Sequence, residues 1–335
     1  MKFEKNKIYW GDCFDLIKKL PDNSIDCIVT SPPYWALRDY GFKEQIGLEE
    51  HPEEFINKIV AFMKEAKRVI KPTGTIFINL GDSFYTRSGG FNNRLSKLPR
   101  LLSKNSPLSK AYTETRGKFK TNWLQAKQKL LIPYRIAIKC QDELSLILRN
   151  DIHWVKQVFN VKSQESFGSS VPNPVKDRLN TNSESVFFFV KDRNYFFDLD
   201  SIRAPYKESS IKRGGYPRKV IKGSARPLCG GVTNRRISFN KNGKNPGDCL
   251  HFPYEPRRED HHAMFPLRLP SFFIECGCPK NGIVLDPFMG SGTTALACLI
   301  TNRSFIGFEA NIRYCDLARG VVRSYIRENE GKTHE

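Results

Sequence analysis

Short apolar runs alternate with amphipathic segments along the first eighty residues. The apolar runs 7–10, 25–30 and 75–80 are rich in β-branched and aromatic residues, which is typical of buried strands. Between them, the apolar positions of residues 13–20 and 55–70 recur at helical intervals. This alternation predicts that the chain opens as a βαβ unit of an α/β protein.

The same pattern continues later in the chain, with two basic interruptions. It predicts a helix over 132–142, then strands over 144–148, 152–158, 185–191 and a short one over 195–197. A compact α/β pattern closes the chain, with helices over 270–276, 293–299 and 313–327 and strands over 283–285 and 305–307. Half of a nucleotide-binding type of fold therefore stands at the end of the chain. A circular permutation explains this order, because the termini of such domains lie at the surface and close together.

The charge of the chain is concentrated in the two interruptions. The formal net charge is +19 over 335 residues, which suggests a polyanionic partner such as nucleic acid. Residues 87–135 hold 12 Lys and Arg against the single Glu114, and residues 203–244 hold 12 against the single Glu208. We expect residues 87–120 to form a mobile basic loop and residues 201–260 to form an inserted module.

The cysteines and the N-terminus indicate the cellular setting. Nine cysteines is an odd number, and the first residues contain no apolar stretch of signal-peptide length, so a reduced cytoplasmic setting is expected. No run approaches the ~18 apolar residues of a membrane span. Cys249, His251, His261, His262, Cys276 and Cys278 lack the paired C-x-x-C spacing of zinc sites, so no metal is expected.

The motif TSPPYW at residues 30–35 directly follows an apolar strand. Pro32 and Pro33 cannot donate hydrogen bonds to a sheet, so the strand must end there. Ser31 precedes a proline and is restricted to extended geometry, which directs its carbonyl and that of Pro32 to one place beside the Tyr34 ring. These groups suit a planar ligand that carries an amine. Taken alone, the motif is equally compatible with a proline turn.

A second motif, GIVLDPFMGSGTT at residues 282–294, has the order strand, glycine loop and helix that forms a ligand site in parallel sheets. It has Gly290 and Gly292 but lacks the third glycine of a dinucleotide fingerprint and the lysine of a P-loop, so phosphate is not the expected ligand. Asp286 and Glu309 end successive strands. They suit a ligand that offers an ammonium group and ribose hydroxyls, as S-adenosylmethionine does.

Together these segments resemble the amino-methyltransferases of DNA in the permuted order called β. In that order the catalytic motif precedes the recognition region, and the cofactor loop comes last. The resemblance spans nearly the whole chain and is carried by GDCFDLIKKLPDNSIDCIVTSPPYW, GTIFINLGDS, RNDIHWVK, SESVFFFVK and HHAMFPLRLPSFFIECGCPKNGIVLDPFMGSGTT. It implies a Rossmann-like α/β methyltransferase fold with a catalytic half at 1–200, a DNA target-recognition insert at 201–260 and a cofactor-binding half at 261–335.

The resemblance also implies roles for individual residues. The catalytic set comprises Ser31, Pro32, Pro33 and Tyr34. The set that binds S-adenosylmethionine comprises Asp12 on the adenine side, Phe288, Gly290 and Gly292 in the loop, and Glu309 on the ribose, with Asp286 at the strand end. For Asp12 alone, a turn residue after Gly11 is the ordinary interpretation.

The first catalytic position bears on the base that is methylated. In the family an Asp or Asn there accompanies adenine N6, whereas Ser tends to accompany cytosine N4. Ser31 therefore favours cytosine N4, with adenine N6 as the alternative. None of the nine cysteines follows a proline, so the nucleophile motif of cytosine C5 methyltransferases is missing.

Other classes of protein explain only part of the pattern. A nicotinamide-dependent oxidoreductase would leave residues 31–34 without a role, and a non-catalytic DNA-binding protein would not need both motifs. Methyl transfer to RNA or protein is a further alternative, which the long basic segments disfavour. The expected partners are double-stranded DNA and a cognate restriction endonuclease, with the enzyme acting as a monomer or a homodimer.

Overall fold

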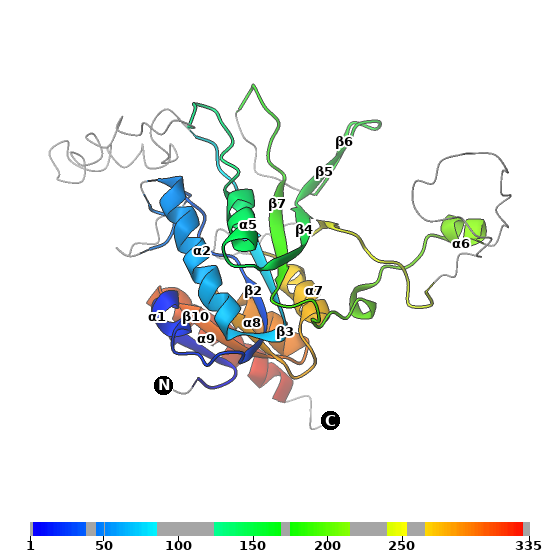
Figure 1. The fold of residues 1–335 in the computed structure, drawn as a ribbon. Coiled ribbons are helices and arrows are strands. Elements are labelled where there is room, and N and C mark those ends of the chain that lie inside the picture. The colour runs from blue at the N-terminus through cyan, green and yellow to red at the C-terminus, as the bar shows by residue number, and fades with distance from the viewer. Residues whose placement is uncertain are drawn as a thin grey trace.

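A central sheet organises the computed structural model, which describes residues 3–37, 45–49, 51–85, 124–168, 175–214, 240–252 and 265–330. The described residues form an eight-stranded sheet in the order β1-β10-β9-β2-β3-β7-β4-β8, and helices cover both of its faces (Figure 1). The last two strands of the chain, β9 and β10, lie between the first two, as the permuted order predicts. The fold is therefore a Rossmann-like α/β fold.

The elements follow the predicted alternation closely in the first and last parts of the chain. The first part comprises β1 (Lys7–Trp10), α1 (Cys13–Ile17), β2 (Ile25–Thr30), α2 (Pro52–Val69), β3 (Ile70–Leu80), α5 (Ile132–Asp142), β4 (Ile147–Val155), β5 (Gln157–Asn160), β6 (Glu165–Gly168) and β7 (Ser183–Val190). The rest comprises a 3-10 turn (Asp200–Ile202), α6 (Glu208–Gly214), β8 (Cys249–His251), α7 (Arg268–Gly277), β9 (Ile283–Asp286), α8 (Thr293–Ile300), β10 (Ser304–Glu309) and α9 (Ile312–Glu330).

Two predicted strands overlap a single observed one. Residues 144–148 and 152–158 were expected to form separate strands, but β4 joins residues 147–148 to residues 152–155, and it pairs with β7 with a register shift between Leu148 and Asn150. Residues 157–158 belong to β5 instead. Beyond β4 the chain forms the β5–β6 hairpin, which extends away from the sheet (Figure 1). The irregularity in the pairing keeps the polar residues Arg149 and Asn150 within a single strand.

The predicted strand at 195–197 is not a strand. Instead, the Phe197 ring stacks on Phe188 with centroids 5.5 Å apart, and Phe188 stacks on Phe77 at 4.6 Å. Phe77 in turn stacks on Phe273 of α7 at 4.8 Å. Ring packing, together with a hydrogen bond of 2.8 Å from the Phe196 N–H to the Thr73 carbonyl of β3, holds this segment against the sheet without forming a strand.

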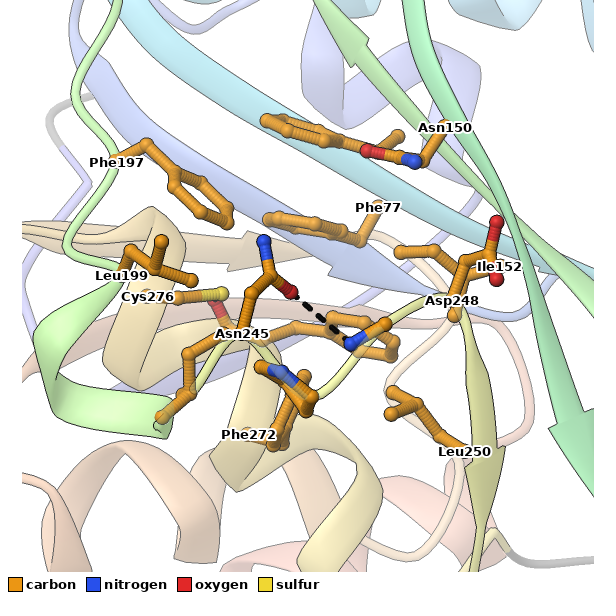
Figure 2. Close-up of a pocket in the computed structure, with 15 residues that line it drawn as sticks. Phe77, Asn150, Ile152, Phe197, Leu199, Asn245, Asp248, Leu250, Phe272 and Cys276 are labelled. Carbon is orange, nitrogen blue, oxygen red and sulfur yellow. Dashed lines mark hydrogen bonds between the residues drawn. The ribbon is translucent and has the colours of Figure 1, made fainter. Parts of the chain in front are cut away.

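These rings border a cavity of about 400 Å³ between the sheet, α7 and the segments around Leu199 and Asn245 (Figure 2). The backbone N–H of Gly247 donates to Asn245 Oδ1 at 3.0 Å in its wall. None of the residues predicted for catalysis or cofactor binding lines this cavity. The cavity is therefore separate from the predicted site residues.

The predicted insert at 201–260 contributes to the sheet. Its strand β8 pairs in parallel with β4, from His153 opposite Cys249 to Val155 opposite His251. The basic loop predicted at 87–120 and the histidines His261 and His262 lie outside the described residues. Within the described ranges, no cluster of three or more His, Cys, Asp or Glu could hold a metal ion. In the same ranges, no helix combines the length and the apolar character needed to cross a membrane.

Strand direction determines which residues meet at the edge of the sheet. Strands β1, β10, β9, β2 and β3 run parallel, so their carboxyl ends lie at one edge. Strand β7 is antiparallel to both β3 and β4, so its first residues lie at that same edge. Strands β4 and β8 run in the same direction as β3, so residues that follow these seven strands and residues that begin β7 lie along that edge.

Candidate active site

The two sequence motifs adjoin at this edge. Strands β2 and β9 are neighbours, with Cys27 opposite Val284 and Ile28 opposite Leu285, so both motifs follow paired strands. A hydrogen bond of 2.6 Å from Thr30 Oγ1 to Asp286 Oδ1 joins them directly. Residues 256 positions apart in sequence therefore fix the TSPPYW motif against the glycine loop.

Asp286 is a buried junction rather than an open ligand group. Its carboxylate also accepts from Thr294 Oγ1 at 2.6 Å and from the backbone N–H of Phe288 at 3.0 Å, and only 1% of the residue is exposed. Burial raises the pKa of Asp286 to about 6, against the opposing effect of these donors. All the contacts named here are internal, so the carboxylate ties β9, the glycine loop and α8 together.

Glu309 holds the glycine loop from the next strand. Its Oε2 accepts from the Gly290 backbone N–H and its Oε1 accepts from the Asn311 N–H, both at 2.8 Å. Burial raises the pKa of Glu309 to about 7. Each carboxylate oxygen can accept a further hydrogen bond, which leaves capacity for ligand hydroxyls.

Gly290 and Gly292 have different structural reasons to be glycine. Both have positive φ, +55° and +92°. No atom lies within 4 Å of where a Gly290 Cβ would be, whereas a Gly292 Cβ would be 3.0 Å from Ala318 of α9. Gly292 therefore allows α8 and α9 to pack closely, and Gly290 leaves open space above the loop.

Asp12 follows β1 and Phe288 follows β9, so both lie at the edge where these strands end. Asp12 Oδ1 accepts from the Phe14 N–H at 2.8 Å and caps α1, while the N–H of Gly11 donates to the Glu309 carbonyl at 2.9 Å. The half-buried Phe288 ring packs on Phe62 of α2 with centroids 5.3 Å apart. The open space above Gly290, the Glu309 carboxylate and an aromatic ring fit a nucleoside that lacks phosphate.

Several contacts hold Tyr34 of the TSPPYW motif in place. A Cβ at Gly81 would lie 2.3 Å from Tyr34 Cε2, so the ring rests on the backbone just beyond β3. Tyr34 OH donates to Glu184 Oε2 at 2.6 Å and accepts from Asn79 Nδ2 at 2.8 Å. Ser31 Oγ lies 3.4 Å from the Tyr34 oxygen. Pro32 is buried, whereas Ser31 and Tyr34 are half-buried.

A buried anchor holds the chain that follows Tyr34. Trp35 is 4% exposed, and its Nε1 donates to the Glu49 carbonyl at 2.9 Å. The Glu49 side chain accepts from the Gly47 N–H at 2.8 Å and pairs with Lys58 at 2.9 Å. Trp35 therefore keeps the end of the motif attached to the segment before α2.

Several site residues were not predicted from the sequence. They comprise Thr30, Asn79, Glu184 and Thr294, which make hydrogen bonds to or within the two motifs, and Lys156, which pairs with Glu184. Thr30 and Thr294 lie inside the motifs and could have been noticed there. Asn79 was detectable as a polar residue in an apolar strand. Nothing local to Lys156 or Glu184 connects them with residues 30–35.

Parallel strands that end at a glycine loop and a proline-locked aromatic motif define an enzyme of the methyltransferase fold. A family model described as DNA methylase matches residues 25–320. The Type II methyltransferase M.Cfr9I of Citrobacter freundii is 32% identical over 311 residues, which cover 93% of this chain and 85% of that protein. M.SmaI of Serratia marcescens is 29% identical over 93% of this chain and 89% of its own length.

Solved structures show the same fold. The cytosine-N4-specific PvuII DNA methyltransferase superposes with a TM-score of 0.58 at 19% identity, over 95% of this chain and 86% of its own. A putative DNA modification methylase of Thermus thermophilus, in complex with S-adenosylmethionine, gives 0.53 at 20% identity over 94% of both chains. The chain belongs to the N6/N4 family of DNA methylases, which are enzymes that use S-adenosylmethionine.

Proposed function

We propose that this enzyme transfers a methyl group from S-adenosylmethionine to cytosine N4 at a specific DNA sequence. The observation that carries this proposal is the Thr30–Asp286 hydrogen bond of 2.6 Å, which places the residues after β2 beside those after β9. Methyl transfer requires an amine acceptor and a methyl donor to lie within about 3–3.5 Å of each other. The adjacency of the two motifs supports such an arrangement.

The cofactor is assigned to the edge formed by β1, β10 and β9. Glu309 would accept the ribose hydroxyls, Asp12 would contact the adenine side, and Phe288 would lie beside the nucleoside, with Gly290 and Gly292 shaping the loop. Asp286, with its carboxylate closed by three internal donors, would act by holding that loop in place. The cofactor supplies an electrophilic methyl group on a sulfonium.

The base is assigned to residues 31–34. An exocyclic amine is paired and conjugated within the duplex, so the base must leave the stack, at a cost of a few kcal/mol. Stacking on Tyr34 would offset much of this cost, since base–aromatic stacking contributes roughly 1–3 kcal/mol. The Ser31 side chain and the carbonyls of Ser31 and Pro32 would accept the amine hydrogens and direct the nitrogen lone pair.

Two observations favour cytosine N4 over adenine N6. Ser31 occupies the first catalytic position, where serine tends to accompany cytosine in this family. The PvuII enzyme, whose fold matches over 95% of this chain, is described as cytosine-N4-specific. Both observations support the cytosine assignment.

We also propose a cellular location and partners for the enzyme. The M.Cfr9I and M.SmaI relatives are Type II methyltransferases, which supports a place beside a cognate restriction endonuclease in the cytoplasm, with the enzyme as a monomer or homodimer. The two basic segments would bind the DNA backbone, and the module at 201–260 would read base edges.

The decisive experiment identifies the modified base. The purified enzyme is incubated with unmethylated genomic DNA and isotopically labelled S-adenosylmethionine, and the digested nucleosides are identified by mass spectrometry. We expect labelled N4-methylcytosine. Labelled N6-methyladenine would overturn the choice of base, and label in no nucleoside would overturn the proposed function.

A further inference from the structure

Glu184 lies at the centre of a hydrogen-bonded network around the Tyr34 hydroxyl. Its Oε2 accepts from Tyr34 OH at 2.6 Å and from Asn79 Nδ2 at 2.9 Å. Asn79 also donates to the Tyr34 oxygen at 2.8 Å, which closes a ring of three hydrogen bonds. The other carboxylate oxygen of Glu184 pairs with Lys156 Nζ. The four side chains come from four separate segments of the chain.

The antiparallel direction of β7 explains why Glu184 reaches this place. Ser185 pairs with Leu80 at the carboxyl end of β3, and Glu184 pairs with Trp154 near the end of β4. A parallel strand in this position would begin at the opposite edge of the sheet. The strand order therefore places one carboxylate between the ends of β3 and β4, within reach of residues that follow β2.

The environment of Glu184 keeps this carboxylate fixed. Only 16% of its side chain is exposed, and Lys156, at 28%, balances its charge. Lys156 itself lies over the Trp154 ring, with Nζ 4.7 Å from the ring centroid. A carboxylate held from one side in this way can serve as a rigid acceptor for the phenol on its other side.

We propose that Glu184 is a positioning residue that acts through the Tyr34 hydroxyl, holding the ring ready to stack on the base that leaves the duplex. This inference rests on the proposed function of Tyr34. Gly81 supports the face of the ring, and Glu184 with Asn79 fixes its far end. A ring fixed at both places loses little conformational freedom when the base arrives, so more of the stacking energy drives base extrusion.

A double-mutant cycle tests whether Glu184 acts through that hydroxyl. Tyr34→Phe removes only the hydroxyl, Glu184→Ala removes its acceptor, and the double variant removes both. We expect each single variant to lower the single-turnover methylation rate by about tenfold, as loss of one charge-assisted hydrogen bond predicts. The methylation rate of the double variant should be within about twofold of the rates of the single variants, because each single substitution removes the same interaction.

Base extrusion is measured separately with a fluorescent base analogue at the target position of the methylated sequence. We expect the fluorescence rise on binding to shrink in both single variants, while the Kd for S-adenosylmethionine is unchanged. Glu184→Asp should restore part of the signal, because it keeps the carboxylate. Glu143→Gln is the matched control, since Glu143 forms an exposed ion pair with Lys139 on α5 and should leave every readout unchanged.

Three results would overturn the inference. These are single-variant losses that multiply in the double variant, a wild-type methylation rate in Glu184→Ala, or an unchanged fluorescence rise in Tyr34→Phe. The Tyr34→Phe measurement decides the matter even if Glu184→Ala fails to fold, because this variant leaves the Lys156–Glu184 pair in place. A wild-type enzyme that methylates no DNA would instead refute the proposed function itself.

Discussion

The roles proposed for Tyr34 and Glu309 assign base handling and cofactor binding to separate single residues. Tyr34 is supported by Gly81 and tethered by Asn79 and Glu184, all at the ends of β3 and β7. Glu309 lies at the end of β10 and holds the glycine loop. The two residues belong to different strand ends, so substitutions at each should separate base handling from cofactor binding.

Tyr34→Ala should lower turnover strongly while cofactor binding stays nearly intact. Removal of the ring forfeits base stacking of roughly 1–3 kcal/mol, which corresponds to a loss of about fivefold to 150-fold. Labelled methyl incorporation into DNA measures the rate, and calorimetric titration with S-adenosylmethionine measures the affinity. A normal rate of label incorporation in this variant would show that the ring does not have the assigned role.

The affinity for S-adenosylmethionine should depend on pH through Glu309. Burial raises its pKa to about 7, so the carboxylate is ionised above that pH and protonated below it. The ionised form is the better acceptor for ribose hydroxyls, so the Kd should rise by up to about tenfold per pH unit below pH 7. Titrations from about pH 6 to pH 7.5 check this. The Glu309→Gln variant should bind more weakly and show a flat profile, and a flat wild-type profile would contradict the assignment.

At the scale of elements, the turn from β9 into α8 combines a closed side and an open side. Asp286 and Gly292 face the protein, where three donors and the backbone of α9 surround them. Gly290 faces open space. The loop is therefore rigid underneath and accessible above, which suits a ligand that lies along it.

Gly290→Ala should separate folding from cofactor binding. Positive φ makes the substitution cost about 1 kcal/mol of folding free energy, but no neighbouring atom opposes the new methyl group. The methyl would occupy the space assigned to the cofactor, so we expect the Kd for S-adenosylmethionine to rise at least about tenfold. Urea denaturation and calorimetric titration measure the two effects. Unchanged affinity with a normal fold would place the cofactor elsewhere.

For the whole molecule, the permuted order has a mechanical consequence. The TSPPYW motif stands near the start of the chain and the glycine loop near its end, yet β2 and β9 are neighbours in the sheet. The junction at Thr30 and Asp286 therefore joins the two ends of the chain. This contact therefore forms only when both parts of the chain have folded onto one sheet.

DNA binding should depend steeply on salt, because the net charge of +19 is concentrated in two segments. A protein that contacts six or more phosphates loses about a thousandfold in affinity between roughly 50 and 200 mM salt. Exchange of Lys110, Arg116, Lys118 and Lys120 for Gln should make the log–log slope shallower by about 3 to 4. Fluorescence anisotropy with a DNA duplex measures the slope. A slope that does not differ from wild type would remove this segment from the DNA interface.

Much of this arrangement can be predicted from the amino-acid sequence. The strand 25–30 has the predicted bounds, both motifs follow strands as expected, and the α/β alternation identified the fold. Local chemistry explains this success, because prolines end strands, glycines form tight loops and apolar periodicity reflects burial. The failures at 144–158 and 195–197 involve segments whose state depends on partners far along the chain.

The chain order of residues specifies the elements, the two motifs and the concentration of positive charge, since each of these depends on neighbours in sequence. The strand order, the burial of Asp286 and the meeting of Glu184 with Tyr34 arise only when distant segments pack. The direction of β7 is the clearest case, because an antiparallel pairing carries a glutamate to the edge where Tyr34 lies. Such contacts are made across the sheet by long-range pairing, and no local pattern records them.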